Sequence, residues 1–243
     1  MSKFRFTNKH KMIYVSENGN VLFLILIAVA LFAALSYAVT SSTRSSGNQG
    51  SEETRLISSA QITQFPAAVT NAVFRMIISG VTVEEIRFNR PQADEFDNLQ
   101  SIEFGVFHPS GGGVSYSPAP ADVMADGAPG DWVFNAEMEV PDIGLSGIGG
   151  NEIIAFLVGL RKSICLKINE EYGLGAVVPE LEGSHSALYT KRMYNDGSSD
   201  YEIPEEDVPD IDDGAGTFDG QPFGCFEDRN TGKYVYYHVV LER

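Results

Sequence analysis

Four aspartates near the C-terminal end of the sequence have the composition of a cation-binding loop. They lie in the acidic stretch 200–220, which is rich in Pro and Gly, and they are Asp210, Asp212, Asp213 and Asp219. Calcium takes about six to eight oxygen ligands from carboxylates and carbonyls on flexible loops, so these side chains are candidate metal ligands. The spacing departs from an EF-hand, because Gly214 occupies a ligand position and no glutamate closes the loop. A solvated acidic loop without metal is the alternative interpretation.

The sequence contains two cysteines, Cys165 and Cys225. Two cysteines in an oxidising compartment most simply form one disulfide. The apolar stretch near the N-terminus predicts a topology that places both residues outside the cytoplasm. Two buried free thiols are the alternative. The spacing does not match a C-x-x-C redox motif or a Cys/His zinc site.

Other residues with catalytic side chains do not form a convincing pattern. Ser184 and His185 are adjacent, but neighbours in sequence rarely point at each other and the G-x-S-x-G elbow of many hydrolases is absent. The glycines at 111–113 lack the Lys-Ser/Thr that follows a phosphate-binding loop, so they predict a turn. We therefore expect a protein that is not an enzyme and has no cofactor, with a hydrolase using acidic-loop carboxylates as a weaker hypothesis.

The net charge of −16 disfavours one class of partner. A strongly acidic chain repels nucleic acid and anionic headgroups, whereas divalent cations and basic proteins remain compatible with it.

An apolar stretch near the N-terminus determines where these candidate residues are placed. Residues 20–40 contain the uncharged run Val21 to Val39, which predicts a transmembrane helix. The leader 1–19 is basic, whereas Arg44 is the only basic residue soon after the run. This asymmetry predicts a cytoplasmic leader, with residues 51–243 on the other side of a bilayer.

The basic leader, Gly19 and the apolar run that follows resemble the class III leader of type IV pilins and pseudopilins. The resemblance covers about residues 1–45 and implies that a prepilin peptidase cleaves between Gly19 and Asn20. Most members carry Glu at the fifth mature position, where this chain has Leu24. It thus resembles a minor or divergent subunit. Cleavage after Ala38, as in ordinary secretion, is the rival prediction.

The remaining pattern predicts an α+β fold, in which a long N-terminal helix packs on a small antiparallel-sheet head with a second helix. We expect a flexible exit at 41–50, a stalk helix at 51–80 that Pro66 kinks or breaks, and a second helix at 151–172. An alternating strand at 132–140 and a C-terminal hairpin at 223–243 are also expected.

These observations give a functional hypothesis and an alternative. The hypothesis is a pilin-like subunit of a type IV pilus or a type II secretion-type filament, in the bacterial inner membrane with its head in the periplasm or on a surface filament. Its partners would be other pilin-like subunits, the prepilin peptidase and the lipid bilayer, and not nucleic acid. The alternative is a single-span, membrane-anchored periplasmic binding domain, with or without calcium, that joins no filament.

Overall fold

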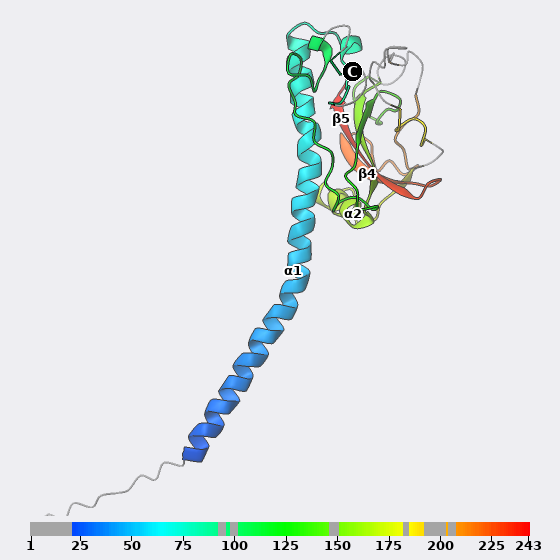
Figure 1. Cartoon of the computed structure of the whole chain (residues 1–243). Coiled ribbons are helices and arrows are strands. Elements are labelled where there is room, and N and C mark those ends of the chain that lie inside the picture. Colours follow the sequence, from blue (N-terminus) through cyan, green and yellow to red (C-terminus); the bar gives the residue numbers. More distant parts are fainter. Residues whose placement is uncertain are drawn as a thin grey trace, which may run out of the picture. The chain divides into compact units, whose positions relative to one another are not determined.

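The computed structural model describes residues 21–91, 96–97, 102–145, 151–181, 185–191, 203 and 208–243. Within these ranges, the side chains of residue 21 and of residues 39–58 are not described. The chain forms two compact units, an N-terminal unit (Met1–Ser51) and a head unit (Glu52–Arg243). The predicted α+β class is confirmed (Figure 1).

The head unit is built on a five-stranded sheet with strand order β1-β2-β5-β4-β3. Its strands are β1 (Trp132–Asn135), β2 (Ile153–Leu160), β3 (Glu180–Leu181), β4 (Phe223–Asp228) and β5 (Lys233–Leu241). The helices are α1 (Val21–Ile78), α2 (Lys162–Glu171) and the short 3-10 helices η1 (Val83–Glu85) and η2 (Ile102–Phe104). The sheet is mixed and not purely antiparallel as expected, because β3 pairs with β4 in parallel.

The expected membrane-spanning helix at 20–40, and with it the single-pass inner-membrane localisation, is not supported. Within the described residues, no helix combines the length and the apolar character needed to cross a bilayer. Beyond the apolar stretch, α1 continues through the Ser- and Gly-rich residues 41–50, which were expected to be a flexible exit.

The second part of α1 is the predicted stalk helix, and Pro66 does not break it. The proline ring is buried, and the hydroxyl of Thr70 donates to the Pro66 carbonyl at 3.0 Å. The helix ends as predicted at Gly80, whose φ of 100° favours glycine. There the N–H of Val81 donates to the Met76 carbonyl at 3.1 Å, in a Schellman arrangement.

The predicted helix at 151–172 is wrong in its first half. Residues Ile153–Leu160 form β2, which pairs with β1 on one side and β5 on the other. A central strand with both faces covered shows a continuous apolar run, and periodicity alone does not separate such a run from a buried helix. Asn151 therefore precedes a strand, and α2 begins only at Lys162.

The predicted strand at 132–140 is shorter and differently buried than expected. β1 covers Trp132–Asn135 only, and all four of its residues are buried. Trp132 and Phe134 belong to a core shared with α1 and α2, whereas Val133 belongs to a second core on the opposite face of the sheet. Residues on both faces of β1 are therefore buried, because an apolar core covers each face of the sheet.

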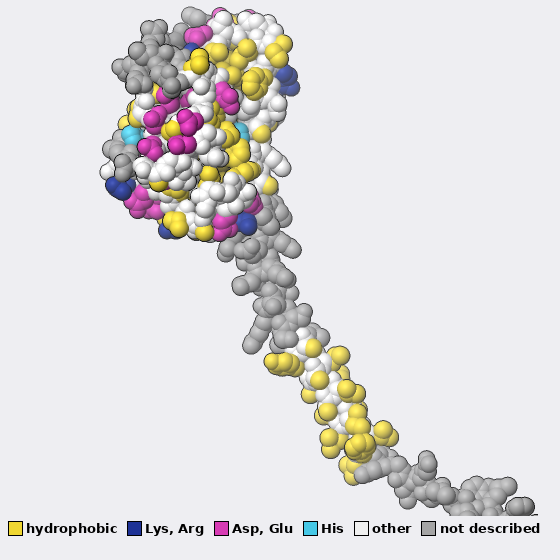
Figure 2. All heavy atoms as spheres, turned by 180° about the vertical axis from the view of Figure 1, so that it is seen from behind, with side chains coloured by type: hydrophobic (Ala, Val, Ile, Leu, Met, Phe, Trp, Pro, Cys, Tyr) yellow, Lys and Arg dark blue, Asp and Glu magenta, His cyan; other side chains and the backbone are white. Residues whose placement is uncertain are grey.

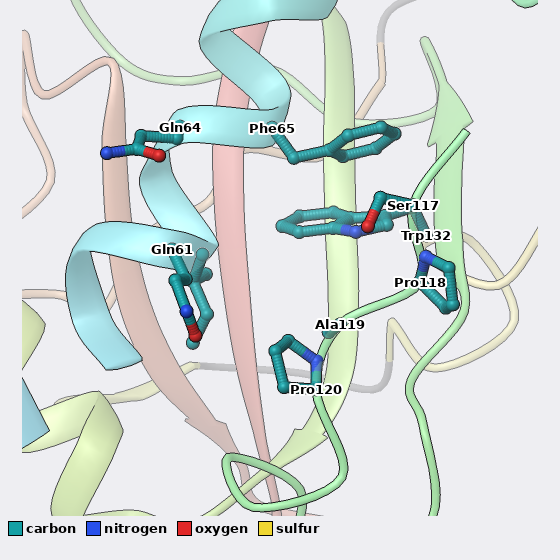
Figure 3. Close-up of a pocket in the computed structure, with 9 residues that line it drawn as sticks. Gln61, Gln64, Phe65, Ser117, Pro118, Ala119, Pro120 and Trp132 are labelled. Carbon is teal, nitrogen blue, oxygen red and sulfur yellow. The ribbon is translucent and has the colours of Figure 1, made fainter. Parts of the chain in front are cut away.

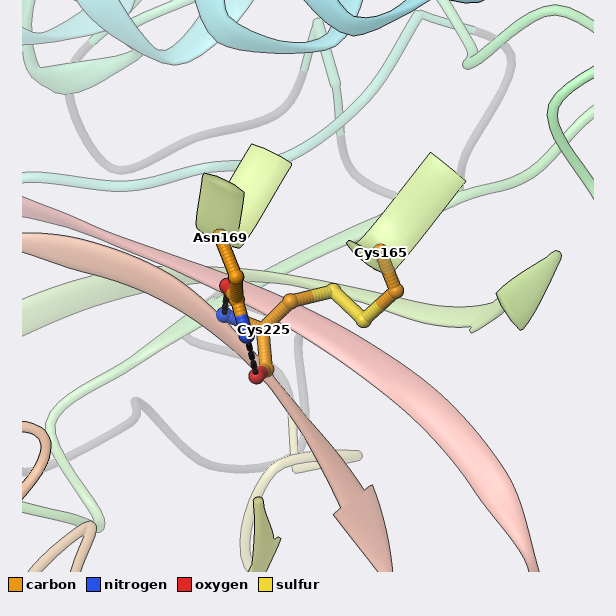
Figure 4. Close-up of a disulfide and its surroundings, with 3 residues drawn as sticks. All are labelled: Cys165, Asn169 and Cys225. Carbon is orange, nitrogen blue, oxygen red and sulfur yellow. Dashed lines mark hydrogen bonds between the residues drawn. A yellow bond between two sulfur atoms is a disulfide. The ribbon is translucent and has the colours of Figure 1, made fainter. Parts of the chain in front are cut away.

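The C-terminal hairpin is confirmed, with β4 and β5 in antiparallel register from Phe223↔His238 to Asp228↔Lys233. Asp228 shapes the turn, since its carboxylate accepts from the N–H groups of Asn230 and Thr231. The predicted disulfide is also confirmed: Cys165 of α2 is bonded to Cys225 of β4 (Figure 4).

Candidate functional site

The acidic loop does not bring its four aspartates together as a ligand set. Asp213 accepts hydrogen bonds from the N–H groups of Ala215 and Thr217 and, at 2.6 Å, from the Thr217 hydroxyl. Burial opposes ionisation of Asp213, but these hydrogen bonds outweigh it and hold its pKa below the ordinary value. Asp212 accepts from the N–H of Gly214, so both carboxylates stabilise their own turn.

The other two aspartates add no converging ligands. The backbone of Asp210 forms a bridge with that of Glu139, and Asp219 lies beside Gly216. Acidic side chains gather on the face of the head seen in Figure 2. Within the described ranges, no three acidic, His or Cys side chains are grouped to hold a metal ion. The structure therefore gives the predicted calcium site no further support.

Several residues singled out in the sequence lie outside the described ranges. These are Gly19 and Asn20 at the predicted cleavage point, and Ser184 of the Ser-His pair. His185 is described, and its carbonyl accepts the N–H groups of Leu188 and Tyr189 in a turn.

The first described residues of α1 form an exposed apolar segment, Leu22–Tyr37. Large side chains there are between 40 % and 78 % exposed, and the six consecutive residues 22–27 are all in this class. Successive residues of an α-helix are about 100° apart, so six in a row cover its whole circumference. The segment is therefore apolar on every side and not along one stripe; Figure 2 shows one such face in yellow.

A second candidate is a pocket in the head unit with a volume of about 350 Å³. Three separate stretches of sequence line it: the helical turns around Gln61 and Gln64, the segment 117–120, and the start of β1 (Figure 3). The complete lining is Gln61, Ile62, Gln64, Phe65, Ser117, Pro118, Ala119, Pro120 and Trp132.

An aromatic cluster fixes the floor of this pocket. The rings of Phe65 and Trp132 lie 5.4 Å apart, centroid to centroid, and Phe65 also contacts the edge of Tyr116 at 5.8 Å. The Tyr116 hydroxyl accepts from the N–H of Trp132 at 3.2 Å and donates to the Asp131 carboxylate. Arg90 pairs with Asp131 at 2.5 Å, so the charge next to the floor is neutralised.

Three polar side chains of the pocket have no role in hydrogen bonding within the described part of the chain. Gln61, Gln64 and Ser117 are exposed, and within the described part of the chain their side chains make no hydrogen bond. Sequence reasoning missed this site because its α1 residues lie more than fifty residues before the other two segments. Only the lone tryptophan and the Ser-Pro-Ala-Pro segment at 117–120 offered a signal.

Comparisons of the sequence with protein-family models and with curated proteins, and of the fold with solved structures, found no match.

Proposed function

We propose that this chain is a pilin-like subunit that assembles through the apolar segment Leu22–Tyr37 of α1. The subunit has no catalytic step; its work is to pack its helix among equivalent helices and to present the head unit for further contacts. The observation that carries the proposal is that this segment is exposed and apolar around its whole circumference.

Such a segment requires apolar neighbours on every side. Burying a large aliphatic or aromatic side chain is worth about 1.5–3 kcal/mol, so the segment contributes a strong driving force for association. A two-helix contact uses a single stripe and leaves the opposite face in water. A helix surrounded by several copies, as in the core of a filament, covers every face at once.

The residue at position 24 supports a minor or divergent role within this proposal. In the family that the leader resembles, a Glu at the fifth mature position pairs with a neighbour's N-terminal amine. Leu24 has no charge to offer in an apolar interior, so register in the assembly would depend on side-chain packing alone.

Cross-linking through engineered thiols tests the packing. The two natural cysteines are bonded to each other, so a new cysteine is the only free thiol. Leu24 and Leu26 are 65 % and 69 % exposed and lie about 200° apart around the helix. We expect a short bis-maleimide to give dimers with Leu24→Cys and with Leu26→Cys, and a ladder of trimers and larger species with both changes together.

The matched control is Leu145→Cys, which replaces a leucine of the head unit that is 73 % exposed. It should give no ladder. Dimers from only one of the two helix positions would indicate a two-helix contact, and the absence of cross-links at both would refute assembly through this segment.

The processing part of the proposal has its own test. Cleavage after Gly19 would leave Asn20 as the first residue, immediately before α1 begins at Val21. Intact-mass measurement of the protein isolated from its own cells should show a chain starting at a methylated Asn20. A chain that retains Met1, or one that begins at Val39, contradicts this processing.

A further inference from the structure

We propose that the pocket between α1 and the segment 117–120 binds an uncharged saccharide. This site lies wholly in the head unit and does not involve the exposed apolar segment, so the inference is independent of the assembly proposed above.

The size of the pocket limits the ligand. A volume of about 350 Å³ is near the lower end for small-molecule sites, which run from about 300 to 1,000 Å³. The lining comes from three segments that face a partly open pocket (Figure 3). This shape suits a sugar ring, or one end of a glycan, better than an extended peptide, which needs a continuous groove.

The charge of the lining selects a neutral ligand. None of the nine lining residues carries a formal charge, although the chain as a whole has a net charge of −16. An anionic ligand finds no cation in the lining and is repelled by the overall field. A cationic ligand finds no carboxylate in the lining and would lose hydration without forming an ion pair.

The polar groups of the lining match a ligand that carries several hydroxyl groups. A glutamine carboxamide donates through its nitrogen and accepts through its oxygen, and a serine hydroxyl does both. Gln61 and Gln64 are three residues apart on α1 and therefore lie on the same side of the helix, while Ser117 lies on the opposite wall (Figure 3). Neighbouring sugar hydroxyls can bond to both walls at once.

The apolar groups of the lining suit the other face of a sugar ring. Phe65 is half-buried at the floor, and Pro118 and Pro120 form the wall next to Ser117. The C–H groups of a pyranose pack well against such surfaces, while its hydroxyls point toward the carboxamides. Trp132 is only 1 % exposed, so it supports this floor and is not itself a stacking platform.

The position of Trp132 gives a direct readout of binding, because it is the only tryptophan in the chain. We expect its fluorescence to change saturably when the full-length chain is titrated with neutral sugars, namely glucose, galactose, mannose, N-acetylglucosamine and their disaccharides. Glucuronic acid and glucosamine are the charged comparators, and they should bind at least tenfold more weakly than their neutral counterparts.

Substitutions in the pocket assign the response to this site. Gln61→Ala and Gln64→Ala should each weaken binding roughly tenfold, since each removes a hydrogen-bonding group from an exposed helix position without disturbing the core. The matched control is Asn71→Ala, which removes an exposed carboxamide from α1 outside the pocket and should leave the affinity unchanged.

Three results would overturn the proposal. The first is no fluorescence response to any neutral sugar; the second is a response that survives the combined Gln61→Ala and Gln64→Ala changes. The third is a proline-rich peptide that binds the pocket more tightly than every sugar, which would make the site a peptide groove.

Discussion

The side chain of Asn169 in α2 pairs with the backbone of Cys225 in β4 as a neighbouring strand would. Its Nδ2 donates to the Cys225 carbonyl at 2.8 Å, and the Cys225 N–H donates to its Oδ1 at 3.0 Å (Figure 4). β3 covers the outer edge of β4 only at Glu227 and Asp228. Asn169 therefore closes part of an otherwise open edge, beside the disulfide that joins α2 to the same residue of β4.

Replacing Asn169 with alanine should destabilise the head unit. The change removes two buried hydrogen bonds and leaves the donor and acceptor of Cys225 without these partners, at an expected cost of about 2–4 kcal/mol. Urea unfolding with the disulfide intact measures the free energy of unfolding. The control Asn71→Ala removes an exposed carboxamide that bonds only to its own helix, and should change stability by less than about 0.5 kcal/mol. Equal effects of the two changes would contradict the edge-closing role.

Glu152 should make the protein less stable as pH rises. Burial and, to a lesser extent, the carboxylates of Glu139 and Glu242 raise the pKa of Glu152 to about 7, although a hydrogen bond from the Val140 N–H acts to lower it. The folded state therefore holds a proton that the unfolded chain loses near the ordinary pKa of 4.5. Stability should fall as pH rises from 4.5 to 7 and stay low above 7.

The variant Glu152→Gln isolates this effect, because an amide has nearly the same shape and keeps an acceptor for Val140. We expect it to be more stable than the natural chain by about 2 kcal/mol at pH 8 and nearly equal to it at pH 4. Thermal unfolding across this range measures the difference. An unchanged pH profile would show that Glu152 is not the group responsible.

His238 should have the opposite dependence. Burial lowers the pKa of His238 to about 4, with its ring stacked on Phe223 at 5.5 Å and its Nδ1 in a hydrogen bond of 2.9 Å with the Tyr236 hydroxyl. Below pH 6.5 the unfolded chain gains a proton that the folded state takes up only near pH 4, so stability should be lost as pH falls from 6.5 to 4.

The variant His238→Gln should remove this loss, so that relative to the natural chain it gains about 2 kcal/mol of stability between pH 6.5 and pH 4. The same unfolding series measures the difference. Glu152→Gln is the control of opposite sign, because over the overlapping range from pH 4.5 to 7 its gain relative to the natural chain grows as pH rises. If the difference between His238→Gln and the natural chain is the same at every pH, the effect is one of packing and not of titration.

The features predicted correctly from the sequence depend on residues close together in the chain or on a simple residue count. The C-terminal hairpin follows from alternating strands joined by the turn 228–232, where the capping aspartate and the glycine are close in sequence. The Gly80 stop depends on one residue with a positive φ. The bond between Cys165 and Cys225 was predicted from the even count, since the chain has only these two cysteines.

The errors came from contacts that only the tertiary structure supplies. Ile153–Leu160 is apolar throughout because it is a central strand, but an uninterrupted apolar run is also typical of a buried helix. Glu137 and Glu139 were expected to lie in an alternating strand at 132–140, but they follow the end of β1 and are only 7 % and 6 % exposed. The pocket at Gln61 and Ser117 depends on segments more than fifty residues apart, which no local pattern reveals.

Apolar cores lie against both faces of the sheet, one shared with α1 and α2 and the other shared with residues such as Tyr189 and Phe218. Neither broad surface of the sheet is left for recognition. A partner of the head unit must therefore approach its perimeter, where loops and the outward side of α1 meet solvent. Substitutions at this perimeter can therefore change which partner binds the head unit without altering either apolar core.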